Sequence, residues 1–478
     1  MAVQLYAPEH KCGIGAAVNT ETLYSDMLGM AISLQHRGYD GCGFSILDTD
    51  TGKTRTYRGP GKVLNVFPDN SQASKVRARN GIFNNRYRTT GDVNSDNLQP
   101  IEFDDLTFSH NGNVFNAGKL AQLYSLAMED HDSDTKVIAQ MIRRARNVED
   151  GIRFVAEEAL GAFNLVIMDN EGTVWAYRDP WGFHPLFKGV KDGSTYFASE
   201  TTALSALRLD DNEIEQMERG ELWAVNGSYR EKKIIRPPHT KKAFCPFEKT
   251  YFMSPDASYD GEFSWDFRTR TGERLAERDH FPDDSASIVV QLRNSGEPYA
   301  VGYSQRSGIP MKRGFAYNPE LGRTYMVEDK LADVGLTSQE LAFLKNMAIK
   351  RVVEGKRVIV PDDSIVRGGT LPGRVDDLFR AGAREVHVRI GSPPIISPCH
   401  MGFNHSDKSK LRAAQAVVLA KSTRLEDIEE QVRKSLDPRL TSLRYLPLTD
   451  YKELLRDNGG HCFACFTGSY PFPITSHA

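Results

Sequence analysis

The alternation of apolar and polar residues predicts a buried strand, a helix and a second strand in the second half of the chain. Residues 358–360, Val-Ile-Val, form a β-branched run typical of a parallel strand covered on both faces. Pro372 suits the first turn of the following helix, whose apolar residues recur at helical spacing. The chain turns at 381–383 and re-enters an apolar strand at 385–390. Such a βαβ unit belongs to an α/β domain, in which ligands bind beyond the carboxyl ends of the strands.

Apolar spacing elsewhere predicts further elements. A strand opens at Cys12, and the other expected elements are a helix at 26–35, a strand at 287–290 and helices at 261–278 and 333–354. The composition changes at 234–242, IIRPPHTKK, which has two prolines, basic residues and no periodicity. Because few contacts cross a linker of this kind, we expect it to separate a first domain at 12–238 from a second domain at 239–478.

The overall composition is that of an ordinary globular protein. The chain has 478 residues, of which 40% are hydrophobic and 26% charged, enough for two or three domains with their own cores. A net charge of −3 does not suggest a nucleic-acid or anionic-membrane surface, and no apolar run has the length of a membrane span. Residues 1–11 lack the apolar core of a signal peptide, so we expect a cytoplasmic protein. Six cysteines are too few for a disulfide framework in this length.

Two adjacent carboxylates and a glycine-rich loop follow the strand at 358–360. Asp362 and Asp363 stand at its carboxyl end, and the loop 364–370, SIVRGGT, offers backbone donors with little side-chain bulk. A phosphate fits such a loop at a helix N-terminus. Two acids beside that phosphate are repulsive unless they face hydroxyls or a divalent cation. A ribose 5-phosphate that carries a pyrophosphate, with Mg²⁺, meets both conditions. The alternative is a βα turn with two solvated acids.

The segment VPDDSIVRGGT at 360–370, continued by EVHVRIGSPP at 385–394, resembles the phosphoribosyl-pyrophosphate loop of glutamine amidophosphoribosyltransferases. The resemblance implies a type I phosphoribosyltransferase domain of α/β fold. Within it Asp362 and Asp363, with Ser295 from the turn QLRNSG, would hold the ribose hydroxyls and Mg²⁺. The positions that match the family's other substrate contacts are Arg367, Gly368, Gly369 and Thr370 in the phosphate loop, Arg323 in a mobile loop, and Lys345.

The chain departs from the family pattern at three notable positions. Arg293 and Asn294 stand where the family normally carries proline and aspartate, and Phe343 stands where arginine is usual. Asn294 keeps the size of aspartate but lacks its charge near the expected metal, and Arg293 adds a cation beside the expected pyrophosphate. These departures support an alternative function, in which a related enzyme aminates a different phosphosugar.

A second resemblance covers the chain from Cys12 to about residue 230. Segments reading HRGYDG, NRYRTTG, SHNGN, SDT, GAF, YRDPWG and SET follow one another in the order of the N-terminal-nucleophile glutaminase domain that glutamine amidotransferases share. The resemblance implies an α+β sandwich with Cys12 as nucleophile. A lone cysteine is more often a small buried residue, and Cys42 is interpreted in that way.

The expected nucleophile also predicts processing of the chain. Thiolate chemistry needs a base, and a free α-amino group, with a pKa of roughly 7.7–8.0, is suited to accept the proton at neutral pH. Because only a free amino end at Cys12 supplies that group, residues 1–11 are predicted to be a propeptide.

The resemblance assigns roles to four further residues of the first domain. Asn111 and the Gly112 backbone N–H would stabilise the oxyanion that forms when glutamine is attacked. Arg86 matches the position that holds the glutamine α-carboxylate, for which a guanidinium fork is suited. Asp134 matches the position that holds the α-ammonium group. Without the resemblance, Arg86 and Asp134 would be interpreted as surface or ion-pair residues.

Four cysteines of the second domain form the pattern of a metal site. They are Cys245, Cys399, Cys462 and Cys465, of which the last two form a C-x-x-C pair. Spacing alone does not separate zinc from an iron–sulfur cluster, and a lone C-x-x-C pair is also compatible with redox chemistry or with no ligand. The resemblance implies a [4Fe–4S] cluster, because a subset of amidophosphoribosyltransferases carries one on these positions together with a propeptide.

The two resemblances together imply a glutamine-dependent amidophosphoribosyltransferase. It would convert phosphoribosyl pyrophosphate, glutamine and water into 5-phosphoribosylamine, glutamate and pyrophosphate, the first step of purine synthesis. The family also implies a homotetramer, inhibition by purine nucleotides and an apolar passage for ammonia between the two sites. A second alternative is a regulatory protein that binds phosphoribosyl ligands without turning them over, against which an intact Cys12, Asn111 and acid pair argue.

Overall fold

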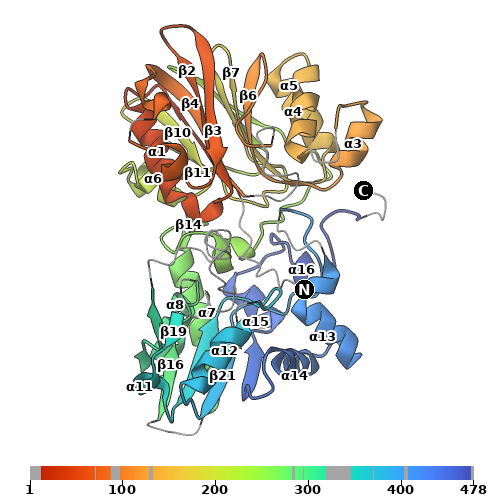
Figure 1. Ribbon diagram of the computed structural model, residues 1–478. Coiled ribbons are helices and arrows are strands. Elements are labelled where there is room, and N and C mark those ends of the chain that lie inside the picture. Colours follow the sequence, from red (N-terminus) through yellow and green to blue (C-terminus); the bar gives the residue numbers. More distant parts are fainter. Residues whose placement is uncertain are drawn as a thin grey trace, which may run out of the picture.

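The computed structural model describes two lobes that follow each other along the chain (Figure 1). The first half of the chain forms one lobe and the second half forms the other. The described residues are 12–69, 71–87, 97–128, 133–281, 286–293, 295–318, 346–369, 371–402 and 407–474. Within them, no helix combines the length and the apolar character that crossing a membrane requires.

The first lobe is built on two antiparallel sheets. One has the strand order β11-β9-β10-β1-β4-β2-β3 and the other the order β13-β12-β8-β7-β6-β5. The strands of the first sheet are β1 (Gly13–Val18), β2 (Gly41–Asp48), β3 (Lys53–Pro60), β4 (Ala78–Arg86), β9 (Phe187–Lys191), β10 (Ser194–Ala198) and β11 (Ile214–Gln216). Those of the second are β5 (Ile101–Glu102), β6 (Leu106–Val114), β7 (Gly161–Asp169), β8 (Val174–Tyr177), β12 (Glu221–Asn226) and β13 (Tyr229–Ile234).

The alternation of side chains along β1 explains why the two sheets stack. Ile14, Ala16 and Val18 point to one face and pack against residues of β7 and β8, such as Val166. Ala17 points to the opposite face and packs in the cluster that contains the helix residue Met27. Each sheet therefore buries one face against the other sheet and the opposite face against helices, which is the predicted α+β sandwich.

Helices cover both outer faces of the sandwich (Figure 1). α1 (Leu23–Ser33) packs on β1 and β4, and α4 (Asp134–Arg144) with α5 (Val148–Glu158) packs on the β6 side. α1 confirms the helix expected at 26–35. The remaining helices of this lobe are α2 (Val63–Val66), α3 (Ala117–Leu123) and α6 (Thr201–Ser205).

The second lobe contains a five-stranded parallel sheet in the order β17-β16-β20-β21-β22. Its strands are β16 (Ser287–Val290), β17 (Met311–Lys312), β20 (Arg357–Asp362), β21 (Glu385–Ile390) and β22 (Ser442–Tyr445). The helices around it are α7 (Ser264–Glu277), α8 (Glu297–Ser307), α12 (Leu371–Arg380), α13 (Arg412–Ala420), α14 (Leu425–Leu436), α15 (Leu448–Leu454) and α16 (Ala464–Thr467). The predicted βαβ unit is confirmed as β20, α12 and β21.

One predicted helix is wrong over the part that the structure describes. The helix expected at 333–354 is replaced after residue 345 by β19 (Asn346–Ala348) and the short α11 (Lys350–Val353), while 333–345 lies outside the described residues. β19 pairs antiparallel with β18 (Phe315–Tyr317), so strand pairing with a distant segment overrides the local helical spacing. The helix expected at 261–278 is confirmed as α7, shortened at its start because Glu262–Phe263 (β15) pairs with Ser258–Tyr259 (β14).

The junction of the lobes is formed by segments from both halves. Residues 235–243 contain no helix or strand and lead from β13 into the second half. There Phe244 pairs in a parallel bridge with His461, which brings the C-terminal part of the chain back to the junction. Trp181 of the first lobe packs in one cluster with Met401 and Phe472. The two lobes are therefore joined by a packed interface as well as by the chain.

Candidate active sites

Cys12 directly precedes β1, which lies between the strands β4 and β10 in the first sheet of the first lobe. Its side chain is buried, with 7% of its surface exposed. The Tyr87 backbone N–H donates to the Cys12 Sγ at 3.5 Å, and Sγ lies 3.6 Å from the Tyr87 carbonyl oxygen. Arg37 Nε donates to the Cys12 carbonyl oxygen at 3.3 Å. The thiol is thus held by the backbone of Tyr87, just after β4, and the main chain of Cys12 by Arg37.

Two of the charged groups that affect the Cys12 thiol, Arg86 and Asp134, are predicted to bind glutamine. Burial raises the pKa of the thiol, and the charge of Asp134 adds to that effect. The hydrogen bond from Tyr87 and the guanidinium groups of Arg86 and Arg37 act in the opposite direction on the same pKa. Arg86 and Asp134 therefore both lie within electrostatic range of the expected nucleophile, although their places in the sequence are far apart.

Asp134 is fixed at the N-terminus of α4. Its Oδ2 accepts the Val114 N–H at 2.7 Å and its Oδ1 accepts the Thr135 N–H at 3.0 Å. An acid in the first turn of a helix is favoured by the helix dipole. Arg86 ends β4 and is 3% exposed. The negative charge of Asp134 and the positive charge of Arg86 are thus held by separate elements, α4 and β4, near the same thiol.

Asn111 and Gly112 lie next to each other in β6, opposite Asn164 and Phe163 of β7. The Asn111 side chain is fully buried, and among the described residues neither its Nδ2 nor its Oδ1 has a hydrogen-bond partner. A buried unpaired amide costs free energy unless a ligand pairs with it, so this side chain fits a group that donates to a bound substrate. Gly112 has φ +154°, and a Cβ there would lie 1.9 Å from the Ala162 carbonyl oxygen.

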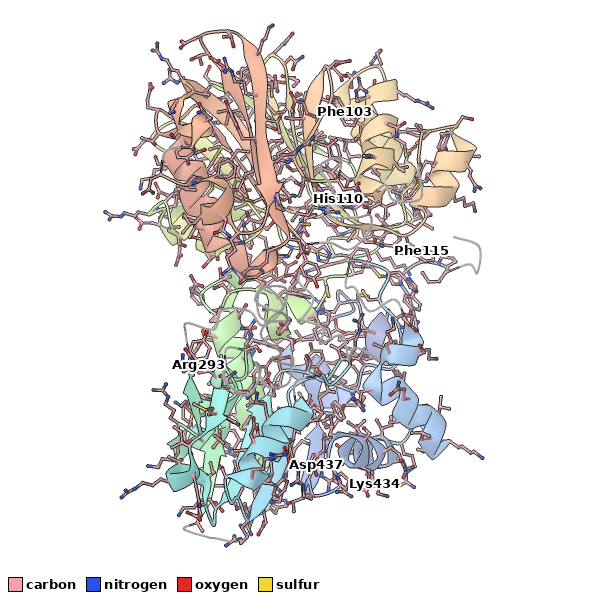
Figure 2. All side chains as sticks on the ribbon, in the orientation of Figure 1. Phe103, His110, Phe115, Arg293, Lys434 and Asp437 are labelled. Carbon is pink, nitrogen blue, oxygen red and sulfur yellow. The ribbon has the colours of Figure 1, made fainter. Side chains whose placement is uncertain are left out.

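His110 is a buried residue of this site to which sequence reasoning assigned no role (Figure 2). Its Nδ1 lies 3.1 Å from Thr135 Oγ1, and its Nε2 lies 3.3 Å from the Ala162 carbonyl oxygen. Burial lowers the pKa of this imidazole, which favours the neutral ring. The ring therefore connects the strand of Asn111 with the helix of Asp134. The sequence signal was its place within SHNGN, which does not distinguish a structural from a ligand-binding histidine.

The second candidate site lies at the carboxyl ends of β16 and β20, which are adjacent parallel strands. Asp362 ends β20, and its Oδ1 accepts the Asp363 N–H at 3.0 Å. Ser364 Oγ donates to Asp363 Oδ1 at 2.5 Å. Burial raises the pKa of Asp362 and then the charge of Asp363 raises it further, while burial also raises the pKa of Asp363. Two acids in this setting are suited to a cation.

Ser295 and Gly296, which follow β16, lie beside the two acids Asp362 and Asp363. A side-chain hydrogen bond between the Ser295 hydroxyl and the Asp363 carboxylate lowers the pKa of Asp363 and so opposes the effect of burial. A Cβ on Gly296 would lie 3.0 Å from Asp362 Oδ1, so only glycine leaves room for the acid there. Arg293, in the lower lobe of Figure 2, places its guanidinium carbon 5.5 Å from the centre of the Tyr317 ring. Ser295, Asp362 and Asp363 therefore lie close together at the ends of these strands.

The glycine loop follows β20 as predicted. Gly368 has φ +68°, a conformation that glycine adopts without strain, and no atom lies within 4 Å of a Cβ built on Gly369. Arg412, at the start of α13, was missed by sequence reasoning, and its Nε would lie 3.1 Å from a Cβ on Gly368. No spacing rule connects Arg412 with this loop. Arg323, Lys345, Thr370, Asn294 and Phe343 lie outside the described residues.

Backbone hydrogen bonds bring together the three segments that carry the four cysteines of the second half. Cys462 N donates to the Phe244 carbonyl oxygen at 2.8 Å, beside Cys245. The N–H groups of Ile396 and Ser397, just before Cys399, donate to the Cys465 carbonyl oxygen at 2.9 and 3.0 Å. Burial raises the pKa of the Cys465 thiol well above its ordinary value, and the other three thiols raise it further.

The four thiols thus lie within electrostatic range of one another, but they do not form a coordination shell in this structure. Among the described residues, no three or more histidine, cysteine, aspartate or glutamate side chains are arranged to hold a metal ion. No disulfide links the six cysteines, all of which are described. Cys42 is fully buried in the core of the first lobe, and burial raises its pKa to about 12, as expected of a core thiol.

Comparison with known proteins places the chain among glutamine amidotransferases. Residues 85–206 match a family model described as a glutamine amidotransferase domain. The amidophosphoribosyltransferase of Methanocaldococcus jannaschii is 34% identical over 467 residues, which cover 92% of this chain and 93% of the relative. The amidophosphoribosyltransferase of Bacillus subtilis is 33% identical over 457 residues, covering 92% and 90%. The solved glutamine phosphoribosylpyrophosphate amidotransferase from B. subtilis, complexed with ADP and GMP, matches with a TM-score of 0.82 and 31% identity over 98% of both chains.

Proposed function

The chain belongs to the amidophosphoribosyltransferase family, and we propose that it transfers ammonia from glutamine to phosphoribosyl pyrophosphate. The products are 5-phosphoribosylamine, glutamate and pyrophosphate, as in the first step of purine synthesis. The observation that carries the proposal is the presence of both sites in one chain. A buried thiol flanked by Arg86 and Asp134 lies in one lobe, and the acid pair with Ser295 lies in the other.

The glutaminase reaction uses residues of the first lobe. Cys12 Sγ attacks the side-chain carbonyl of glutamine, and the oxygen of the tetrahedral intermediate accepts hydrogen bonds from Asn111 Nδ2 and the Gly112 N–H. Collapse of that intermediate releases ammonia and leaves a glutamyl thioester, which water hydrolyses to glutamate. Arg86 binds the α-carboxylate of glutamine and Asp134 binds its α-ammonium group. The unpaired, buried amide of Asn111 supports this assignment.

The base of this reaction is the α-amino group of Cys12. The burial that raises the pKa of the thiol makes a nearby proton acceptor necessary at neutral pH. Residues 1–11 are then a propeptide, residues 12–238 the glutaminase domain and residues 239–478 the phosphoribosyltransferase domain. The two sheet systems support this division, since every strand of the sandwich precedes residue 235 and every strand of the parallel sheet follows residue 286.

The transfer reaction uses residues of the second lobe. Asp362 and Asp363 bind the ribose hydroxyls, and with Ser295 they hold Mg²⁺, which neutralises the pyrophosphate when bound. The N–H groups of Gly368 and Gly369, with Arg367 and Thr370, bind the 5-phosphate. Ammonia attacks C1 of the ribose, and the bond from C1 to the pyrophosphate oxygen breaks. The buried acid pair, in which burial and the charge of Asp363 raise the pKa of Asp362, supports the cation site, because a divalent ion offsets the repulsion between the two carboxylates.

The four cysteines of the second lobe hold a [4Fe–4S] cluster in this proposal. Cys245, Cys399, Cys462 and Cys465 supply four thiolates from three segments, and the mutual effect of the thiols on the pKa of Cys465 supports their convergence. Bound iron and sulfide would compensate the negative charge that four thiolates bring into a buried place. The cluster would then stabilise the junction, because two of these segments are also hydrogen-bonded to the first lobe: the Cys245 N–H donates to the Phe183 carbonyl oxygen, and the His400 carbonyl oxygen beside Cys399 accepts from Asn113.

The partners and setting follow from the family. We infer a cytoplasmic homotetramer inhibited by purine nucleotides, and the ADP and GMP in the solved B. subtilis relative support nucleotide binding. The experiment that tests the function measures glutamate and pyrophosphate release by the processed protein, with and without phosphoribosyl pyrophosphate and Mg²⁺. Glutamine hydrolysis that rises with phosphoribosyl pyrophosphate, together with stoichiometric pyrophosphate, is the expected result. Glutaminase activity that another phosphosugar stimulates instead would favour the related-enzyme alternative, which Arg293 supports.

A further inference from the structure

We propose that residues 398–402 of the second lobe act as a positioning element for the oxyanion-binding strand segment at residues 111–113 of the first lobe, with Gly402 as the positioning residue. This inference rests on the proposed glutaminase function. It assigns to the transferase half a contribution to the chemistry of the other half, through a contact with this strand segment itself.

Gly402 packs directly against the peptide that joins Gly112 and Asn113. Its φ is +102°, which favours glycine, and a Cβ there would lie 3.2 Å from the Gly112 carbonyl carbon. The same Cβ would lie 3.4 Å from the Gly112 carbonyl oxygen and 3.5 Å from Asn113 N. On another side, a Cβ on Gly112 would meet the Ala162 carbonyl oxygen at 1.9 Å. Gly112 is therefore confined by the backbone of β7 and by the backbone of Gly402.

Hydrogen bonds from the first lobe hold this segment in place. Asn113 Nδ2 donates to the His400 carbonyl oxygen at 2.9 Å, and His184 Nε2 lies 3.0 Å from the Met401 carbonyl oxygen. The His400 ring lies 4.6 Å from the ring of Phe115, which Figure 2 places at the lower edge of the upper lobe. Met401 is 3% exposed. His400 and Met401 of the second lobe are thus fixed to three residues of the first, Asn113, Phe115 and His184.

The segment is equally well fixed to its own lobe. Tyr470 Oη donates to the Pro398 carbonyl oxygen at 2.7 Å, and the Ser397 N–H donates to the Cys465 carbonyl oxygen. A change in the transferase lobe therefore reaches the Gly112 peptide through continuous covalent and hydrogen-bonded contacts. An oxyanion donor acts only when it lies about 2.7–3.1 Å from the developing charge. A small displacement of the Gly112–Asn113 peptide moves the backbone of Gly112, whose N–H belongs to the preceding peptide bond, and consequently changes the rate of glutamine hydrolysis.

The test compares Gly402→Ala with Gly308→Ala, which also places alanine at a positive φ but lacks the contact. Gly308 has φ +73° and no atom within 4 Å of a Cβ built on it, and it follows the last turn of α8 in the same lobe. Gly402→Ala should lower kcat for glutamine hydrolysis by about 100-fold, the loss typical of catalytic groups displaced by about 1 Å. KM for glutamine should stay within about 2-fold, because the oxyanion forms only after binding. Synthesis from added ammonia should also stay within about 2-fold.

Asn113→Ala provides a second variant that leaves the backbone of residues 398–402 unchanged. Loss of one hydrogen bond should lower kcat for glutamine hydrolysis by about 5-fold, and it decides the question if Gly402→Ala does not fold. In the double variant the fall in kcat should be smaller than the product of the two single falls, because both substitutions act on one contact.

Three results would overturn the inference. The first is an equal kcat for glutamine hydrolysis in Gly402→Ala and Gly308→Ala. The second is a parallel fall of glutamine hydrolysis and ammonia-dependent synthesis in Gly402→Ala. The third is an unchanged kcat in Asn113→Ala when Gly402→Ala is insoluble. Wild-type protein that fails to hydrolyse glutamine would overturn the proposed function and this inference together. Active wild-type protein with unaffected variants overturns the inference alone.

Discussion

Arg37 and Glu248 form a doubly hydrogen-bonded ion pair between the two halves of the chain. Arg37 Nη1 lies 3.0 Å from Glu248 Oε2, and Nη2 lies 3.2 Å from Oε1. Both side chains are buried, and Nε of the same guanidinium donates to the Cys12 carbonyl oxygen. Glu248 also pairs with His184, and Arg37 with Glu200. One buried network thus touches the expected nucleophile, the start of the second half and the histidine that contacts Met401.

This relationship predicts a large loss of stability when one partner is removed. Glu248→Gln leaves the buried guanidinium with less compensating charge, at a cost of roughly 3–5 kcal/mol. Calorimetry should therefore show a clearly lower midpoint of thermal unfolding. Glu21→Gln, which breaks the exposed pair with Arg79, is the control and should leave the midpoint unchanged. Equal shifts in the two variants would contradict the role of burial.

A second prediction concerns the nucleophile. Cys12→Ala should abolish glutamine-dependent synthesis and keep synthesis from added ammonia, because the thiol and the acid pair lie in different lobes. Intact-mass measurement of active wild-type protein should show an amino end at Cys12. Active protein that still carries residues 1–11 would rule out the α-amino group as base.

The acid pair predicts the converse separation of activities. Asp362→Asn with Asp363→Asn removes both charges from the proposed cation site, and synthesis should be lost even from ammonia. Basal glutamine hydrolysis should persist, although phosphoribosyl pyrophosphate should no longer stimulate it. Isothermal titration with Mg²⁺ and phosphoribosyl pyrophosphate provides the measurement. Tight binding by the double variant would show that other residues hold the substrate.

The cysteine set predicts iron and sulfide in protein purified without oxygen. Cys462→Ser should lose both, as measured by elemental and sulfide analysis, and should be less soluble because the ligand set ties three segments together. Cys42→Ala is the matched control, since that thiol is fully buried in the other lobe and should leave the iron content unchanged. One zinc per chain with no iron would refute the cluster.

Asp179 predicts a dependence of stability on pH. Burial raises the pKa of this carboxyl to about 6, and its Oδ2 has no hydrogen-bond partner among the described residues. Between about pH 4 and pH 6 the folded chain then holds more protons at this site than the unfolded chain, so stability falls as pH rises through that range.

Asp179→Asn should remove this contribution. Its amide oxygen can still accept the N–H groups of Trp181 and Gly182, which now bond to Asp179 Oδ1 at 2.9 and 2.8 Å. The midpoint of thermal unfolding of the variant should therefore rise relative to that of wild type as the pH increases from about 4 to 6. Asp169→Asn is the control, because Asp169 Oδ1 accepts two N–H groups in a similar turn that is partly exposed. A constant difference between Asp179→Asn and wild type across this range would contradict the assignment.

The sequence by itself determined the local elements and the residue types of both sites. β16 and β21 have the predicted bounds, and the acid pair stands at the end of β20 as expected. These features depend on the periodicity of apolar residues and on turn chemistry, which are properties of short segments. The expected helix at 333–354 failed in its last part because β19 pairs with β18, a partner that local spacing does not specify.

Only the tertiary structure decided which distant residues meet. Arg412 beside Gly368, Glu248 beside Arg37 and Gly402 against Gly112 each join segments whose spacing follows no motif. Such contacts arise when complete sheets and helices pack, so their geometry is set by the shape of the whole interior and not by the neighbouring residues in the chain. The motifs identified the candidate groups for the chemistry, whereas the packing of the two lobes brought Gly402 against Gly112.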